Sequence, residues 1–109
     1  MKHLLTLIAL LAATPAMAQK VIPPVEFDHP YKGDFVILRL KDQAEIRANC
    51  GPTTLPYHLG CGQRATSGIC VMILATDEFI RSKGWTPEMV LRHEIGHCNG
   101  WPADHRGAR

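Results

Sequence analysis

The sequence contains no cluster of positive charge. Lys and Arg total 12 against 10 Asp and Glu, which gives a formal net charge of +2 over 109 residues. Because domains that bind nucleic acid carry a basic patch or stripe, we expect no nucleic-acid partner. The sequence also has no apolar run of the roughly 20 residues that a membrane-spanning helix requires. Hydrophobic residues make up 46% and charged residues 20%, proportions typical of a folded globular domain.

The longest mainly apolar run lies near the start of the sequence. It covers residues 4–13, follows Lys2, and precedes Thr14-Pro15 and the small residues of Ala16-Met17-Ala18. A polar start, a short apolar stretch and an Ala-x-Ala site are the marks of a signal peptide. We therefore predict a signal peptide over residues 1–18, with no stable membrane insertion after its cleavage. Residues 19–109 would then form a single exported domain, periplasmic or secreted, which we expect to be a monomer.

The sequence has no Cys-x-x-Cys pair. Its four cysteines are Cys50, Cys61, Cys70 and Cys98, spaced by 11, 9 and 28 residues. These spacings fit no zinc ribbon or finger. An even number of cysteines in a small exported chain is typical of disulfides. We expect two disulfides, and the spacings leave all three pairings open.

The order of apolar and turn-forming segments predicts an α+β fold. Residues 19–32 contain three prolines and are expected to form an extended lead-in. Residues 35–40 (FVILRL) fit a buried strand or the start of a helix. Residues 41–50 fit either a strand or a helix. Residues 51–68, rich in Gly, Pro, Thr and Ser, are expected to be a long loop. Residues 69–75 (ICVMILA) predict a buried strand, and residues 77–85 a turn or short helix ending at Gly84.

Residues 87–98 carry the signals of a helix with both ends marked. Thr86 suits the N-cap and Pro87 the first helical position. Gly100 stands where a left-handed residue commonly ends a helix. At about 100° per residue the apolar residues share one side, which we expect to face the core: Leu91, Ile95 and Cys98. We therefore expect a small sheet packed on this C-terminal helix, which carries the candidate active site, with disulfides stapling the fold.

The adjacent side of this helix carries a motif with metal chemistry. His93-Glu94-Ile95-Gly96-His97 has the form HExxH. Residues four apart lie one turn above each other, so both imidazoles can bind one Zn²⁺. Glu94 beside them can take a proton from water that the metal activates. The predicted cofactor is Zn²⁺, although such ligands also suit other first-row ions.

A catalytic zinc needs a third protein ligand and one open position. No Glu follows Glu94, so the downstream candidates are Asp104 and His105. We favour His105, because imidazole is the commoner neutral ligand. Asp104 would then orient one of the ligating side chains without binding the metal itself. The reverse assignment, with Asp104 as the third ligand, stays open. His58 is a weaker candidate, and the simplest interpretation of His58 and His29 is a solvated loop histidine.

The segment His93-Glu94-x-x-His97-x-x-Gly100 resembles the zinc-binding sequence of the metzincin metallopeptidases, and zincins in general. The resemblance implies peptide hydrolysis with His93 and His97 as ligands and Glu94 as general base and acid. The sequence departs from the metzincin pattern at Ala103, which occupies the usual third-ligand position, and no Met follows to form the Met-turn. In zincins a strand beside the catalytic helix pairs with extended substrate, which makes the edge of strand 69–75 a candidate docking site.

Two hypotheses follow. The first is a small exported zinc metallopeptidase, an endopeptidase acting on a peptide or protein substrate. The second is a non-catalytic, disulfide-stapled protein that binds metal or another partner. They differ at the fourth coordination position, which an enzyme keeps open to water and a structural site fills.

Overall fold

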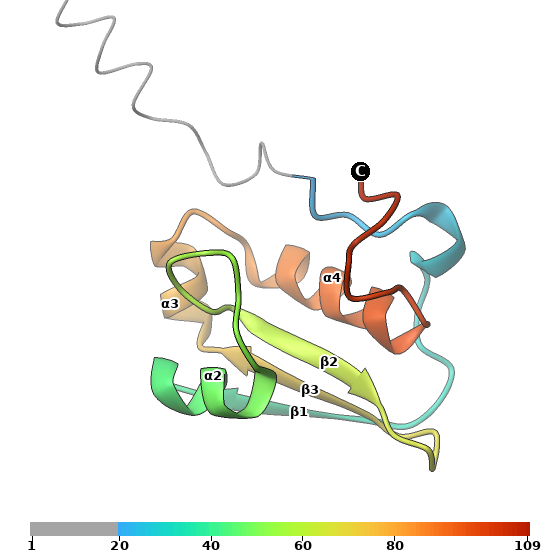
Figure 1. The fold of residues 1–109 in the computed structure, drawn as a ribbon, viewed down its shortest axis with the longest axis horizontal. Helices are drawn as coiled ribbons and strands as arrows, with labels where there is room; N and C mark the ends of the chain where they lie inside the picture. Colours follow the sequence, from blue (N-terminus) through green and yellow to red (C-terminus); the bar gives the residue numbers. More distant parts are fainter. Residues whose placement is uncertain (1–19) are drawn as a thin grey trace, which may run out of the picture.

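The structure, a computed structural model, describes residues 20–109; the predicted signal peptide lies outside this range. Its architecture is α+β, as predicted, with a three-stranded sheet and helices on both faces (Figure 1). The elements are η2 (Val25–Phe27), β1 (Phe35–Leu40), α2 (Gln43–Cys50), β2 (Gly60–Arg64), β3 (Cys70–Ala75), α3 (Asp77–Ser82) and α4 (Pro87–Cys98).

The sheet has the strand order β1-β3-β2. β3 pairs in parallel with β1, in the register Phe35↔Cys70, and antiparallel with β2, in the register Arg64↔Cys70. Residues 35–40 and 69–75 therefore form strands, as predicted. The expected burial is confirmed for β3 but wrong for β1, an edge strand on which Phe35, Val36 and Leu38 are exposed. Because β3 has a neighbour on each side, the expectation that its edge receives a substrate is wrong. The free edge nearest α4 belongs to β2.

β2 is the element that the sequence did not predict. It lies inside residues 51–68, which we expected to be a loop throughout, and its sequence is GCGQR. None of these residues is a strong strand former, and two are glycines. The strand forms because its backbone pairs with the strongly apolar β3 and because the Cys50–Cys61 disulfide ties it to α2.

The helices follow their local signals. Residues 43–50, which fitted a helix or a strand, form α2, and the side chain of Asp42 accepts a hydrogen bond from the Ala44 N–H at its start. α4 spans Pro87–Cys98 as predicted, and the Thr86 side chain caps it through the Met89 N–H. Gly100 has φ +104°, the left-handed conformation expected after the helix.

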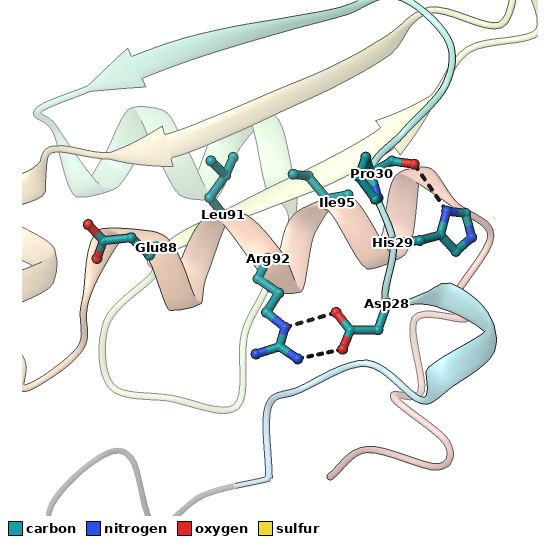
Figure 2. A pocket seen from close by; sticks show the side chains of 7 residues that line it. All are labelled: Asp28, His29, Pro30, Glu88, Leu91, Arg92 and Ile95. Atoms are coloured by element: carbon teal, nitrogen blue, oxygen red, sulfur yellow. Dashed lines mark hydrogen bonds and ion pairs between the residues drawn. The ribbon is translucent and has the colours of Figure 1, made fainter.

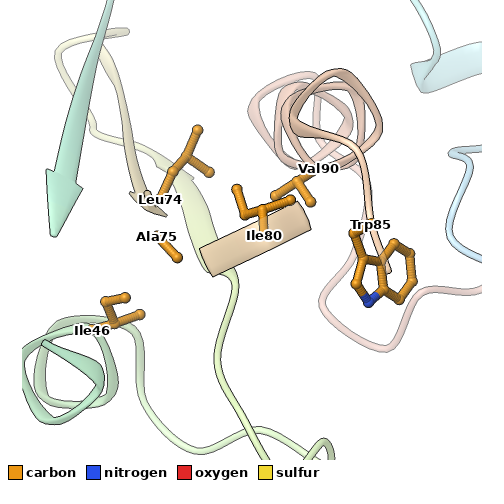
Figure 3. Packing of buried hydrophobic residues seen from close by; sticks show 6 residues of the cluster. All are labelled: Ile46, Leu74, Ala75, Ile80, Trp85 and Val90. Atoms are coloured by element: carbon orange, nitrogen blue, oxygen red, sulfur yellow. The ribbon is translucent and has the colours of Figure 1, made fainter. Parts of the chain in front are cut away.

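A cluster of buried side chains joins α2, α3, α4 and the sheet (Figure 3). Its members are Ile46, Leu74, Ala75, Ile80, Trp85 and Val90. A second cluster, formed by Cys70, Met72 and Cys98, lies under the C-terminal half of α4. Together they fix α4 against the sheet, which positions the motif it carries.

Two disulfides staple the fold, as predicted. They join Cys50 to Cys61 and Cys70 to Cys98, which selects one of the three open pairings. The first ties α2 to β2 on one face of the sheet, and the second ties β3 to α4 on the other. This cysteine usage is compatible with an oxidising, exported location. In the described range, no helix has the length and apolar character needed to cross a bilayer.

Candidate metal centre

Three imidazoles converge at one point above α4. The Nε2 atoms of His93 and His97 lie 3.3 Å apart, and each lies 3.1 Å from the Nε2 atom of His105. Nitrogen ligands about 2.0–2.1 Å from a tetrahedral Zn²⁺ are about 3.3 Å from one another. Three such nitrogens at these separations fit the ligand set of one first-row metal ion.

Backbone carbonyls set the orientation of two of these rings. His93 Nδ1 donates to the carbonyl oxygen of Val21 at 2.7 Å, and His97 Nδ1 donates to that of Trp101 at 2.8 Å. Because Nδ1 carries the proton, the Nε2 lone pair of each ring faces the shared point. Burial lowers the pKa of His93 to about 4 and also lowers the pKa values of His97 and His105. All three rings are thus held in the neutral form that binds metal.

The third histidine arrives from the tail that follows α4. After Gly100 the chain reverses, and the His105 N–H donates to the Pro102 carbonyl oxygen at 3.0 Å. His105 has φ +58°, and among residues 20–109 no other residue except glycine has positive φ. A side chain held in the left-handed region persists only where its surroundings enforce it, and such residues gather at functional sites.

An ion-pair network holds the tail in this position; we call Asp28, Arg92 and Arg109 the clasp. Asp28 lies in the lead-in, Arg92 on α4 and Arg109 at the end of the tail. The Asp28 carboxylate accepts two hydrogen bonds from Arg92, at 2.8 and 2.5 Å, and one from Arg109, at 2.7 Å. The backbones of Ile22 and Arg109 also exchange two hydrogen bonds, at 3.0 and 2.8 Å. Both ends of the described chain are therefore fastened beside the histidine cluster.

Trp101 packs against the histidine cluster. The sequence did not predict this role for it. The centroid of its ring lies 4.9–5.0 Å from the centroids of all three imidazoles. The ring stacks on that of His97 at an interplanar angle of 14°. Its Nε1–H donates to the Arg106 carbonyl oxygen at 2.8 Å, next to His105 in the chain. Trp101 thus packs against all three imidazoles and supports the cluster. An aromatic residue four positions after His97 was the available signal.

Glu94 lies on the buried side of α4 and is only 4% exposed. We expected Leu91 and Ile95 to lead the core-facing side, but both are half-buried, whereas Val90, Glu94 and Cys98 are buried. The helix is rotated in this way because it packs on Gly62 of β2, where an added Cβ would lie 2.8 Å from the Glu94 carbonyl oxygen. Desolvation raises the pKa of Glu94 to about 8.

Gly96, inside the motif, allows a second close approach. An added Cβ would lie 2.5 Å from Cγ of the buried Pro23 and 3.1 Å from Cε3 of Trp101. The lead-in can therefore run directly over α4 only because residue 96 has no side chain. This contact positions Val21 so that its carbonyl oxygen accepts the hydrogen bond from His93 Nδ1.

The other predicted candidates lie apart from the cluster. Asp104, the alternative third ligand, pairs instead with Arg106, at 2.9 Å. His58 is buried in the loop before β2 and donates from Nε2 to the Gly51 carbonyl oxygen at 3.0 Å. His29 is exposed, and its ring Nδ1 donates to the adjacent Pro30 carbonyl oxygen at 3.0 Å. The structure thus brings His93, His97 and His105 together without these three.

The cluster opens into a cleft of about 930 Å³ between α4 and β2. The loop before β2 forms one wall, and the lead-in and tail form the other. His93, Glu94, His97 and His105 all line it. A smaller hollow of about 370 Å³ lies on the opposite side of α4 (Figure 2). Its rim is the Asp28–Arg92 pair and its floor is Leu91 and Ile95, so it shows where the lead-in crosses the helix.

Comparison with protein families, with curated proteins and with solved structures finds no match to this chain. Its function therefore has to be argued from the site itself.

Proposed function

We propose that the chain is a small exported zinc metallopeptidase that hydrolyses peptide bonds in the cleft between α4 and β2. The observation that carries the proposal is the convergence of three Nε2 atoms within 3.1–3.3 Å of one another, beside a buried carboxylate that lines the same cleft. A purely structural site would have its fourth ligand supplied by the protein. Among the described residues three side chains group here, so a four-coordinate ion held by them would have one position left for water.

Each residue of the site has a separate role in the proposed reaction. His93, His97 and His105 hold the ion, and a zinc ion held there supplies a Lewis acid and makes water a nucleophile at neutral pH. In its ionised form Glu94 would accept the proton of the attacking water and return it to the leaving amine. A cation held beside it would favour this form and so oppose the burial that raises the pKa of Glu94 to about 8. The carbonyls of Val21 and Trp101 keep the first two imidazoles aligned.

The free edge of β2 supports a peptide as the substrate. β2 lines the cleft and lacks a strand on its outer side, so its backbone groups can pair with an extended chain. Gly62 lets α4 pack directly on β2, since an added Cβ would lie 2.8 Å from the Glu94 carbonyl oxygen, so this edge runs close beside Glu94.

The decisive test replaces the base and keeps the ligands. The oxidised protein is loaded with zinc and incubated with a mixed peptide library, and products are counted by mass spectrometry. Glu94→Gln should retain one equivalent of zinc and lose about 10²- to 10⁴-fold in rate, the usual contribution of general-base catalysis. Equal rates in the wild type and in this variant would refute the mechanism.

Metal content tests the ligand set separately. One equivalent of zinc in the wild type, lost in both His93→Ala and His105→Ala, is the expected result. Loss in His93→Ala alone would point to Asp104 or His58 as the third ligand. Bound zinc without cleavage of any peptide would leave a metal-binding protein, the alternative hypothesis.

A further inference from the structure

We propose that the cleft selects peptide segments that carry acidic side chains next to the bond that is cut, and that Arg64 and Lys20 make this selection. The inference rests on the proposed function for the cutting step only. The charge preference itself is a property of the cleft wall, and it can be measured as binding.

The charges of the cleft lining are unbalanced. Apart from the histidines, its charged residues are Lys20, Arg64 and Glu94, and no Asp contributes. Glu94 is buried, so the charges near the mouth are both positive. A bound divalent cation adds to the same sign. A cleft lined by one sign of charge concentrates ligands of the opposite sign.

Arg64 occupies the metal side of β2. It pairs with Cys70 in the sheet register, and directly opposed residues of an antiparallel pair point to the same face. Cys70 faces α4, to which its disulfide binds it. Because the two preceding positions on this face are glycines, Arg64 is the first side chain that a segment paired along β2 would meet beyond Glu94.

Lys20 reaches the cleft from the opposite wall. It precedes Val21, whose carbonyl oxygen holds His93, so it enters beside the histidine cluster. Both cations are exposed, and neither takes part in an ion pair within residues 20–109. By contrast, Arg92, Arg106 and Arg109 are each neutralised by a carboxylate. The two unpaired cations are thus free to meet a substrate carboxylate.

The expected size of the preference is modest and depends on salt. An exposed ion pair changes an equilibrium by about 1.5- to 5-fold. Two such pairs should favour acidic over neutral segments by up to roughly 20-fold at low ionic strength. The preference should shrink as salt rises from about 0.01 to 0.15 M, where screening acts within about 8 Å.

The test uses the zinc-loaded, disulfide-bonded protein and a library of ten-residue peptides with blocked ends. In the wild type, Asp and Glu should be enriched within three positions of the cleavage sites. Arg64→Gln should reduce this enrichment, and Arg64→Glu should shift it toward Lys and Arg. Arg81→Glu makes the same charge change on the exposed side of α3, away from the cleft, and should leave the preference unaltered.

A second measurement separates the two proposals. Zinc-loaded Glu94→Gln is titrated with fluorescent peptides of equal length that are acidic, neutral or basic. Tighter binding of the acidic peptide, lost in the Arg64→Glu background, is the expected outcome. Cleavage without any charge preference would overturn the inference and leave the peptidase intact. Acid-selective binding without cleavage by the wild type would overturn the peptidase and leave the inference intact. Equal binding of all three peptides would overturn the inference.

Discussion

At the scale of single residues, Gly96 has the most restrictive surroundings in the motif. Its missing side chain lets Pro23 and Trp101 approach α4 from two directions. Gly96→Ala should destabilise the protein by up to about 2 kcal/mol, because overpacking a rigid, buried contact costs about 1–3 kcal/mol and the better helix propensity of Ala returns about 1 kcal/mol. Urea unfolding measures the change.

A second substitution, at Pro23, tests whether the contact with Pro23 causes the loss of stability. Pro23→Ala removes the Cγ atom nearest to the new methyl group, so the double variant should recover part of the stability that Gly96→Ala loses. Purely additive losses in the double variant would show that the Pro23 contact does not limit residue 96.

His58 predicts a pH dependence of stability. Its ring bridges the loop before β2: Nε2–H donates to Gly51, and Nδ1 accepts from the Gly60 N–H at 3.3 Å. Burial lowers its pKa from the ordinary value of 6.5. The unfolded chain therefore binds the proton more readily, so His58 lowers stability as pH falls through 6.5 toward its folded pKa.

His58→Asn isolates this contribution. An Asn side-chain oxygen can accept the same Gly60 N–H two residues on and does not titrate. The free energy of unfolding, measured in urea between pH 8 and pH 5, should fall more steeply for the wild type than for His58→Asn. Contributions from the three clustered histidines are common to both proteins and cancel in the difference. Parallel curves would contradict the assignment.

Among the site residues, those on α4 could be predicted from the sequence and their supports could not. The i, i+4 spacing brings His93 and His97 together whatever surrounds them. Trp101 lies beneath them only because the chain reverses at Gly100. The carbonyls that orient the rings have no sequence signature, because every residue carries one.

At the scale of elements, the tail carries His105, the proposed third ligand, but has no regular secondary structure to hold it. The clasp supplies that support from the lead-in. Asp28→Asn should weaken zinc affinity by about 3- to 10-fold, below the 10- to 100-fold typical of groups that bond a ligand directly. Competition with a chromophoric chelator measures the affinity. Glu26→Gln, on the neighbouring turn η2, is the matched control and should change little.

A double-mutant cycle shows whether Asp28 acts through His105. His105→Ala leaves only His93 and His97 as ligands, so the weak binding that remains at high zinc concentration should be almost the same with and without Asp28→Asn. An equal loss in both backgrounds would mean that the clasp stabilises the fold in general and does not position the third ligand.

Local sequence signals predicted some helices and strands and missed others. α4 has a cap, a proline at its first position and an apolar side, and β3 is apolar throughout, so both could be found from the sequence. β2 has two glycines and one cysteine in five residues, and it is held by pairing with β3 across the following turn and by the disulfide to Cys50, 11 residues earlier. The residues of β2 themselves carry no strand signal, yet this strand lines the cleft.

At the scale of the whole molecule, the two disulfides should differ in their effects. Cys70–Cys98 closes a span of 28 residues and Cys50–Cys61 a span of 11. Chain-entropy arguments assign about 3.6 kcal/mol to the longer loop and about 2.8 kcal/mol to the shorter. Cys98 directly follows His97, so Cys70→Ala/Cys98→Ala should also weaken zinc affinity.

The second pair is the control for the first. Cys50→Ala/Cys61→Ala should lower stability with little change in zinc affinity, because this bond joins α2 to β2 and neither cysteine adjoins a histidine of the cluster in the chain. Urea unfolding and zinc titration of both double variants measure the two effects. Identical affinity losses would contradict this separation.

The paired backbones of Ile22 and Arg109 make the described chain a nearly closed ring. A few glycines between Arg109 and Lys20 should complete the circle at little cost, since the ends already lie together. The cyclic polypeptide should keep the proposed zinc site and resist trimming by exopeptidases, which mass spectrometry would reveal. Such a circle could be reopened at the exposed turn between β2 and β3, which would give the molecule new termini for immobilisation.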